Sequence, residues 1–251
     1  GRVSEIVGER ALELDRFNRR IGMAYGAEQT LKAMENDPVT RDVLTAYTAG
    51  VNAWIRQLTP ARYPIEYKLL GYAPEPWTPL KCALLLKQMT STLAGGADDL
   101  LMSNILRKYG AAVTNDLFPN YPTHEDPIIP VGTKWDFKPL PVPPMPPDTG
   151  VGRQVAARLA ADLPRPTPEI GSNNWAVGAQ KSATGYPILA NDPHLSLSLP
   201  SIWYQMQLVT PTLNVYGATL PGAPNVIIGF NKDVAWGVTN VGSDVLDFYT
   251  V

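Results

Sequence analysis

The sequence predicts an α+β protein in which helices come first, a proline-rich connector follows, and antiparallel strands come last. Three observations carry this prediction. Apolar residues recur at steps of three and four in the N-terminal part, ten prolines fall within residues 119–149, and short β-branched and aromatic runs follow Ser172. We therefore divide the chain into a mainly helical part (1–118), a proline-rich connector (119–171) and a strand-rich part (172–251).

The clearest predicted helix lies between Asp42 and Leu58. Its apolar positions fall on one helical face, because they are spaced three or four residues apart: Val43, Leu44, Tyr47, Val51, Trp54, Ile55 and Leu58. A second helix is predicted from about Leu80 to Met89, because Thr78 and Pro79 are typical of an N-cap and a first helical position. A third is predicted from Asp98 to Tyr109, ending at Gly110.

The connector and the strands differ sharply in composition. Proline lacks the amide donor and fixes φ, so the proline density of residues 119–149 predicts an extended segment without regular structure. The runs that follow are short and are separated by Gly, Pro and Asn, which favours antiparallel pairing. We predict strands over residues 175–177, 202–209, 213–219, 226–230 and 234–239.

Bulk composition excludes several classes of protein. A net charge of −2 gives no basic surface that would attract nucleic acid, and no apolar run reaches the length of a membrane span. The one cysteine, Cys82, allows no intrachain disulfide and is expected to be a buried apolar residue. The chain begins at Gly1 and ends within a strand-like run, so we expect a piece of a longer protein that is incomplete at both ends.

The candidate for catalysis is Gly171-Ser172-Asn173-Asn174-Trp175, where the connector meets the first strand. Attack of the Ser172 hydroxyl on the Gly171 carbonyl, followed by hydrolysis, would leave Ser172 as a new N-terminus. Its free amine, with a pKa of about 7.7–8.0, would then serve as the base that a serine nucleophile needs. Taken alone, these residues also fit an ordinary linker turn.

Downstream motifs give this segment a context: Asn191-Asp192-Pro193-His194-Leu195, Leu220-Pro221-Gly222-Ala223-Pro224, Gly229-Phe230-Asn231-Lys232 and Trp236-Gly237-Val238-Thr239-Asn240. The set, in this order, resembles the start of the β subunit of the penicillin acylase family of N-terminal nucleophile hydrolases. Upstream, residues 1–5 and 72–77 resemble that family's α subunit. The resemblance implies an αββα sandwich, with two antiparallel sheets between helical layers.

The resemblance also assigns catalytic roles. Ser172 matches the family's N-terminal nucleophile, and His194 matches a position that orients the nucleophile's amine and hydroxyl. Asn240 matches the residue whose backbone N–H donates to the oxyanion. The family's second oxyanion donor, a side-chain Asn far downstream, is not in this chain. From its local sequence alone, His194 also fits a turn after Pro193.

Other matches concern a metal and the acyl group. Asp244 and Asp247, with the carbonyl of Leu246, match calcium ligands of the family, and Asp98 or Asp99 is the nearest acidic candidate upstream; a solvated turn is the alternative for the Asp244/Asp247 pair. Leu93, Leu195 and Ile228 match the phenylalanines that line the acyl pocket of aromatic-specific members. Aliphatic walls favour an aliphatic acyl chain, although the same residues also suit a core.

The resemblance therefore implies hydrolysis of the amide bond of a small N-acyl compound, such as a penicillin or cephalosporin side chain, after autoproteolysis between Gly171 and Ser172. The alternative is an acyl-homoserine-lactone acylase. For these 251 residues alone, an inactive, unprocessed precursor fragment is expected. The resemblance implies α and β chains from one precursor as partners, possible structural calcium, no organic cofactor, and a periplasmic or extracellular location.

Overall fold

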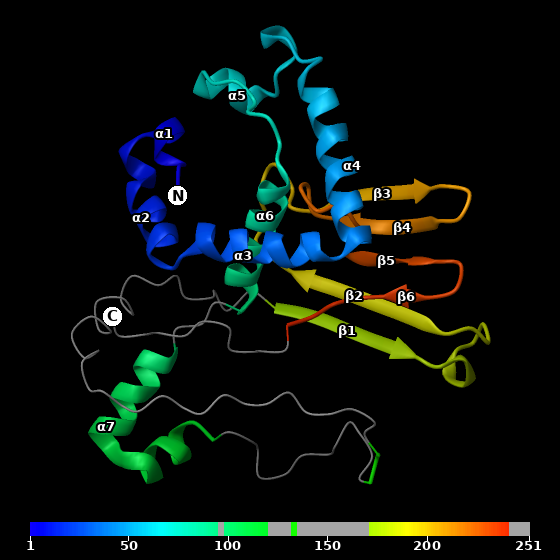
Figure 1. Ribbon diagram of the computed structural model, residues 1–251. Coiled ribbons are helices and arrows are strands. Elements are labelled where there is room, and N and C mark those ends of the chain that lie inside the picture. The colour runs from blue at the N-terminus through cyan, green and yellow to red at the C-terminus, as the bar shows by residue number, and fades with distance from the viewer. Residues whose placement is uncertain (95–97, 120–131, 135–170, 241–251) are drawn as a thin grey trace. The chain divides into compact units, whose positions relative to one another are not determined.

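The computed structural model of the protein describes residues 1–94, 98–119, 132–134 and 171–240. The chain divides into two units, of which one comprises residues 1–95 and 166–243 and the other residues 96–165 and 244–251. Most of the described elements belong to the first unit, which combines helices and antiparallel strands (Figure 1). The α+β prediction is confirmed at this level.

The described helices match the order predicted from the sequence. In chain order they are α1 (Ser4–Val7), the 3-10 turn η1 (Glu9–Ala11), α2 (Leu12–Arg20), α3 (Met23–Asn36), α4 (Pro38–Ile55), η2 (Pro60–Arg62), α5 (Ile65–Leu70), α6 (Pro79–Ala94) and α7 (Asp98–Leu117). None of the helices in the described ranges is long and apolar enough to cross a membrane.

Helix α4 begins earlier than its apolar pattern predicts, because Asp37 caps it. The Asp37 carboxylate accepts hydrogen bonds from the backbone N–H of Thr40 at 2.8 Å and from its hydroxyl at 2.6 Å. Pro38 takes the first helical position, where its missing N–H costs nothing. The predicted start of α6 at Pro79 is confirmed. As predicted, the helix that begins at Asp98 is broken at Gly110, whose φ is 78°; a second helical run follows this kink and extends to Leu117.

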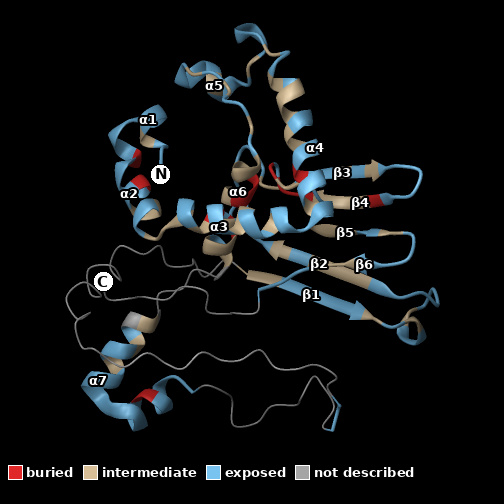
Figure 2. Ribbon diagram, in the orientation of Figure 1, coloured by how far each residue is buried: buried red, intermediate tan, exposed pale blue. Residues whose placement is uncertain are grey.

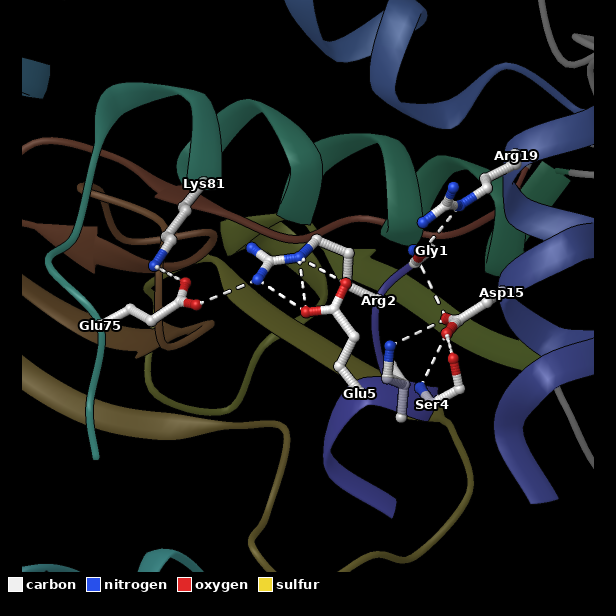
Figure 3. Close-up of polar contacts among 9 residues, drawn as sticks. Gly1, Arg2, Ser4, Glu5, Asp15, Arg19, Glu75 and Lys81 are labelled. Atoms are coloured by element: carbon white, nitrogen blue, oxygen red, sulfur yellow. Dashed lines mark hydrogen bonds and ion pairs between the residues drawn. The ribbon is translucent and has the colours of Figure 1, made fainter. Parts of the chain in front are cut away.

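The first helices are held together around one buried carboxylate (Figure 3). Asp15 is only 3% exposed and accepts hydrogen bonds from the backbone N–H of Val3 at 2.9 Å, the backbone N–H of Ser4 at 2.7 Å and the Ser4 hydroxyl at 2.5 Å. Beside this cluster, Glu75 lies between two cations, 3.5 Å from Arg2 and 3.2 Å from Lys81. These contacts link the N-terminal segment to the loop before α6.

The strands form two antiparallel sheets. One pairs β1 (Gly171–Val177) with β2 (Ile188–His194), and the other has the order β3 (Tyr204–Val209), β4 (Asn214–Thr219), β5 (Ile228–Asn231) and β6 (Ala235–Trp236). Five of these strands overlap the predicted ones. The sequence analysis missed β2, because Asn191-Asp192-Pro193 has the composition of a turn.

The core lies where α3, α4 and α6 meet and continues into β4 and the loop that follows it (Figure 2). Ala27 of α3 and Ala83 of α6 are fully buried, and such small side chains let two packed helices approach closely. Cys82 is also buried, as expected, and burial raises the pKa of its thiol. In the strand part, the buried residues are Val215 and Thr219 of β4, and Leu220 and Val226 of the loop between β4 and β5.

The motif Leu220–Pro224 docks the second sheet onto the helices. The backbone N–H of Gly222 donates to the Tyr47 hydroxyl at 2.9 Å. Gly222 has φ of 109°, and a Cβ there would lie 2.9 Å from Leu85 and 3.3 Å from Trp77. Trp77 is itself fixed by Asn52, whose side chain exchanges hydrogen bonds of 2.7 and 2.9 Å with the Trp77 backbone. The helical part and the strand part therefore share one packed junction.

Candidate active site

Ser172 lies at the start of β1, directly after the Gly171 residue to which it is still joined. Its side chain is half-buried, and its hydroxyl donates a hydrogen bond to the Gly171 carbonyl oxygen at 2.6 Å. Gly171 carries no side chain, and a Cβ built there would meet no atom within 4 Å. The hydroxyl thus contacts the carbonyl group that the predicted self-cleavage would attack.

The β1–β2 register fixes which residues face Ser172. Pro193 lies opposite Ser172, and His194 lies opposite Gly171. Directly opposed side chains of an antiparallel pair project to the same face, and successive residues alternate between faces. Ser172 and Asn191 therefore belong to one face of this two-stranded sheet, and His194 belongs to the other.

On its own face, the imidazole of His194 has a carboxylate partner. Its Nε2 lies 2.8 Å from Oδ2 of Asp192, two residues earlier on β2, and the ring is 42% exposed. The structure thus brings His194 next to the cleavage point through its backbone pairing with Gly171, while its ring contacts Asp192. The predicted role of His194 in orienting the nucleophile stays a prediction.

A third segment, residues 237–240, runs past β1 and β2. Its Thr239 hydroxyl donates to the backbone carbonyl of Ser172 at 3.2 Å. The Asn191 side chain holds the same segment at Val238, accepting from the Val238 N–H at 2.9 Å and donating to the Val238 carbonyl at 2.9 Å. Asn240, the predicted oxyanion donor, is exposed and follows Thr239 directly. Three segments far apart in sequence thus meet at Ser172.

The residues predicted to line an acyl pocket come from three places in the first unit. Leu93 lies near the end of α6, Leu195 follows β2, and Ile228 begins β5; each is half-buried. Partial burial suits a binding wall and a core equally well, so this assignment stays a prediction.

Of the predicted calcium ligands, only the upstream candidates Asp98 and Asp99 belong to the described residues. Asp244, Leu246 and Asp247 lie outside the described residues, and Asp98 begins α7, although its side chain is not described. Within the described ranges, no group of three or more His, Cys, Asp or Glu side chains could hold a metal ion. The calcium site therefore also stays a prediction.

Two contributors to this arrangement were not predicted from the sequence as part of the site. Asn191 bridges two segments, and Thr239 binds the carbonyl of the candidate nucleophile. Both belong to motifs that carry the family resemblance. Nevertheless, the contact between Asn191 and Val238 spans 47 residues, so no local pattern reveals it.

Chemically, the arrangement offers a hydroxyl against a peptide carbonyl and backbone N–H groups nearby. A serine hydroxyl needs a base to act as a nucleophile. Within the described residues, the ring of His194 is turned toward Asp192, and Ser172 donates to Gly171. A free amine on Ser172 itself would supply a base at the required place.

Comparison with known proteins places this arrangement in a family. The sequence profile of the Penicillin amidase family matches residues 1–251. The chain is 34% identical over 254 residues to the acyl-homoserine lactone acylase QuiP of Pseudomonas aeruginosa, and 32% identical over 267 residues to the penicillin acylase 2 proenzyme of Pseudomonas sp. strain SE83. Each match covers 99% of this chain, but only 29% and 31% of the respective relative.

A third relative matches a shorter stretch more closely. The acyl-homoserine lactone acylase PvdQ of Pseudomonas putida is 46% identical over 94 residues, which is 36% of this chain and 12% of that protein. The chain thus spans less than a third of the length of the relatives that it matches over nearly all its residues. Because the family profile matches from the first residue to the last, the chain belongs to the penicillin amidase family.

Proposed function

We propose that the full-length protein is a self-activating amidohydrolase whose nucleophile, Ser172, is freed by cleavage of its own bond to Gly171. The observation that carries this proposal is the 2.6 Å hydrogen bond from the Ser172 hydroxyl to the Gly171 carbonyl oxygen. It places the attacking group beside the group to be attacked, and reactions between groups held in this way are strongly favoured over encounters in solution.

The cleavage consists of two balanced steps. The Ser172 oxygen bonds to the Gly171 carbonyl carbon, the C–N bond breaks, and the hydroxyl proton passes to the departing nitrogen, which leaves an ester and a free amine. Water then hydrolyses the ester, restoring the hydroxyl and giving Gly171 a carboxylate.

After cleavage, the Ser172 amine takes the proton of its own hydroxyl as the oxygen attacks the acyl carbon of an amide substrate. The leaving amine receives that proton, and water then releases the acyl group from Ser172. Asn240 contributes its backbone N–H to the developing oxyanion, and losing one such donor costs about 10²–10³ in rate. His194 acts beside the nucleophile as a positioning residue.

The proposed substrate is a small N-acyl compound with an aliphatic acyl group. Aliphatic side chains at the matched pocket positions Leu93, Leu195 and Ile228 support this choice. Relatives named penicillin acylase and acyl-homoserine lactone acylase both support an acyl amide. An acyl-homoserine lactone is the second candidate beside a β-lactam side chain, because relatives of both names match over nearly the whole chain.

Three further features of the full-length protein belong to the proposal. The αββα sandwich is supported by antiparallel sheets and helices within one unit. A structural calcium ion would be held by Asp244, the Leu246 carbonyl, Asp247 and Asp98, whose oxygens are of the kind that Ca²⁺ prefers. A periplasmic or extracellular location is carried over from the family.

The substrate proposal is tested by a hydrolysis panel on the full-length protein. The panel contains acyl-homoserine lactones with aliphatic chains, penicillins with aromatic and aliphatic side chains, and the Ser172→Ala variant as control. We expect turnover of aliphatic acyl amides that is absent in Ser172→Ala. Equal turnover by Ser172→Ala would contradict the proposed nucleophile, and preference for the aromatic side chain would contradict the proposed pocket.

A further inference from the structure

The Asn191 side chain lies between β1, which carries Ser172, and residues 237–240, which carry the proposed oxyanion donor Asn240. Its Nδ2 group donates to the Asn173 carbonyl on β1 at 3.0 Å and to the Val238 carbonyl at 2.9 Å. Its Oδ1 accepts the Val238 N–H at 2.9 Å. The side-chain amide thereby pairs with both backbone groups of Val238, as another strand would. It fixes residues 237–240 against the residue that follows Ser172.

Gly237 leaves room for this contact. A Cβ at Gly237 would lie 2.8 Å from both Cβ and Oδ1 of Asn191, which is closer than two such atoms approach in proteins. Any larger residue would push the segment away from Asn191. Gly237 therefore supplies the space and Asn191 supplies the hydrogen bonds that hold this segment.

The contact acts at short range on the proposed oxyanion donor. Val238 precedes Asn240 by two residues, and the intervening Thr239 donates to the Ser172 carbonyl at 3.2 Å. An extended chain advances only about 3.3–3.6 Å per residue, so Asn240 lies close along the chain to the point that Asn191 holds. A misplacement of about 1 Å can cost about 10²-fold in rate.

We propose that Asn191 is a positioning residue that sets the distance between the Ser172 nucleophile and the backbone N–H of Asn240. This inference rests on the proposed function of Ser172 and Asn240. Asn191 itself contacts neither the scissile bond nor the substrate; it acts through Val238. Because Asn191 is only half-buried, water can satisfy the groups that it leaves, so its removal should disturb geometry more than stability.

The test compares Asn191→Ala, Asn191→Asp and Gly237→Ala in the full-length protein, with Asn214→Ala as the matched control. Asn214 is an exposed strand asparagine whose side chain accepts a hydrogen bond from Gln207 at 2.9 Å in another hairpin. Asn191→Asp keeps the size and the acceptor for the Val238 N–H but loses the donor group. The readouts are kcat, KM, Tm, and labelling of Ser172 by phenylmethylsulfonyl fluoride followed by intact mass.

We expect kcat to fall about 10–100-fold in all three variants, with KM, labelling and Tm close to those of the wild type and the control. Loss of cleavage before Ser172 in a variant with wild-type Tm also supports the proposal, since the same alignment is lost.

Wild-type kcat in Asn191→Ala or Asn191→Asp would overturn the positioning role. So would a fall in Tm that accounts for the lost activity, or failure of both Asn191 variants to fold, because either would make Asn191 a support of the fold. A wild-type protein that hydrolyses no acyl amide would refute the proposed function instead, which keeps the two failures distinct.

Discussion

Asp15 is a buried carboxylate whose ionisation is coupled to folding. Burial by itself would raise the pKa of Asp15, but hydrogen bonds from the Ser4 hydroxyl and the backbone N–H groups of Ser4 and Val3 outweigh it and lower the pKa to about 2. The ordinary value is 3.8. A carboxylate with a depressed folded-state pKa stabilises the fold above its ordinary pKa, and this stabilisation is lost as the pH falls through the folded value.

Replacing this carboxylate by an amide tests the linkage. Asp15→Asn should lower Tm most at pH above about 4, and the difference from the wild type should shrink toward pH 2. Thermal unfolding followed by circular dichroism between pH 2 and pH 7 measures this. The control is Asp42→Asn, because the Asp42 side chain is 79% exposed. A Tm difference for Asp15→Asn that stays constant over this range would contradict the hydrogen-bonded, ionised carboxylate.

At the residue scale, the sequence indicates a candidate nucleophile but not its contacts. The position of Ser172, behind the proline-rich connector and ahead of the family motifs, predicts that role, which stays a prediction. The hydrogen bond to Gly171 could not be predicted, because it depends on side-chain geometry. Asn191 belongs to one of the motifs that carry the family resemblance, but its bridge to Val238 forms only when two distant segments are folded together.

At the scale of elements, the paired strands β4 and β5 leave no room for a side chain where Gly217 and Gly229 lie opposite each other. Gly217 lies opposite Gly229, and a Cβ at Gly217 would fall 2.1 Å from the Ile228 carbonyl oxygen and 2.6 Å from Cα of Gly229. These are backbone atoms, so a side chain can be accommodated only by moving a strand. The neighbouring cross-strand pair, Tyr216 and Phe230, has ring centroids 5.5 Å apart.

We predict that Gly217→Ala destabilises the protein by more than about 3 kcal/mol, beyond the usual cost of overpacking, and lowers its soluble yield. Gly50→Ala is the matched control. Gly50 lies within α4, a Cβ there would meet nothing within 4 Å, and alanine should stabilise the helix by about 0.5–1 kcal/mol. Urea unfolding compares the two. Similar effects of both substitutions would show that the strands do not need the close approach.

Element prediction failed where local composition and tertiary context disagree. Helix α4 was recognised from its periodicity, but its first turn depends on the Asp37 cap, which lies outside the apolar pattern. Strand β2 was missed because Pro193 and its neighbours resemble a turn. Proline is tolerated there because β1 and β2 form a two-stranded sheet in the described structure, so each is an edge strand.

For the whole molecule, the junction at Gly222 matters because it joins chain segments from both sides of the proposed cleavage point. Tyr47 comes from the helical part, and its hydroxyl accepts the Gly222 N–H. Burial raises the pKa of the Tyr47 hydroxyl, so it stays protonated and neutral at physiological pH. Trp77 packs edge-on against Tyr47 with ring centroids 6.5 Å apart, which completes the contact.

Tyr47→Phe should destabilise the protein by about 1–3 kcal/mol, because it leaves a buried N–H without its acceptor. Tyr186→Phe is the control, since Tyr186 is 74% exposed. If cleavage follows as proposed, Tyr47→Phe should also let the two resulting chains separate at a lower urea concentration, as measured by size-exclusion chromatography. Equal behaviour of the two variants would mean that the Gly222 contact does not hold the parts together.

Within the described residues, the order of helices and then strands was predictable from the sequence, because apolar periodicity and β-branched runs are local properties. The proline-rich connector lies largely outside the described residues and stays a prediction. The way in which the Leu220–Pro224 motif closes onto α4 and α6 was not predictable. It depends on a positive φ at Gly222 and on shape complementarity with Leu85 and Trp77, neither of which leaves a pattern along the chain.

Release of Ser172 from Gly171 by self-cleavage can be tested by the intact mass of the purified full-length protein and of its Ser172→Ala variant. We expect the wild type to give separate chains, one of which begins at Ser172, and Ser172→Ala to remain joined across this position. A wild-type protein that stays joined there after long incubation would contradict self-cleavage. So would cleavage before residue 172 in the Ser172→Ala variant.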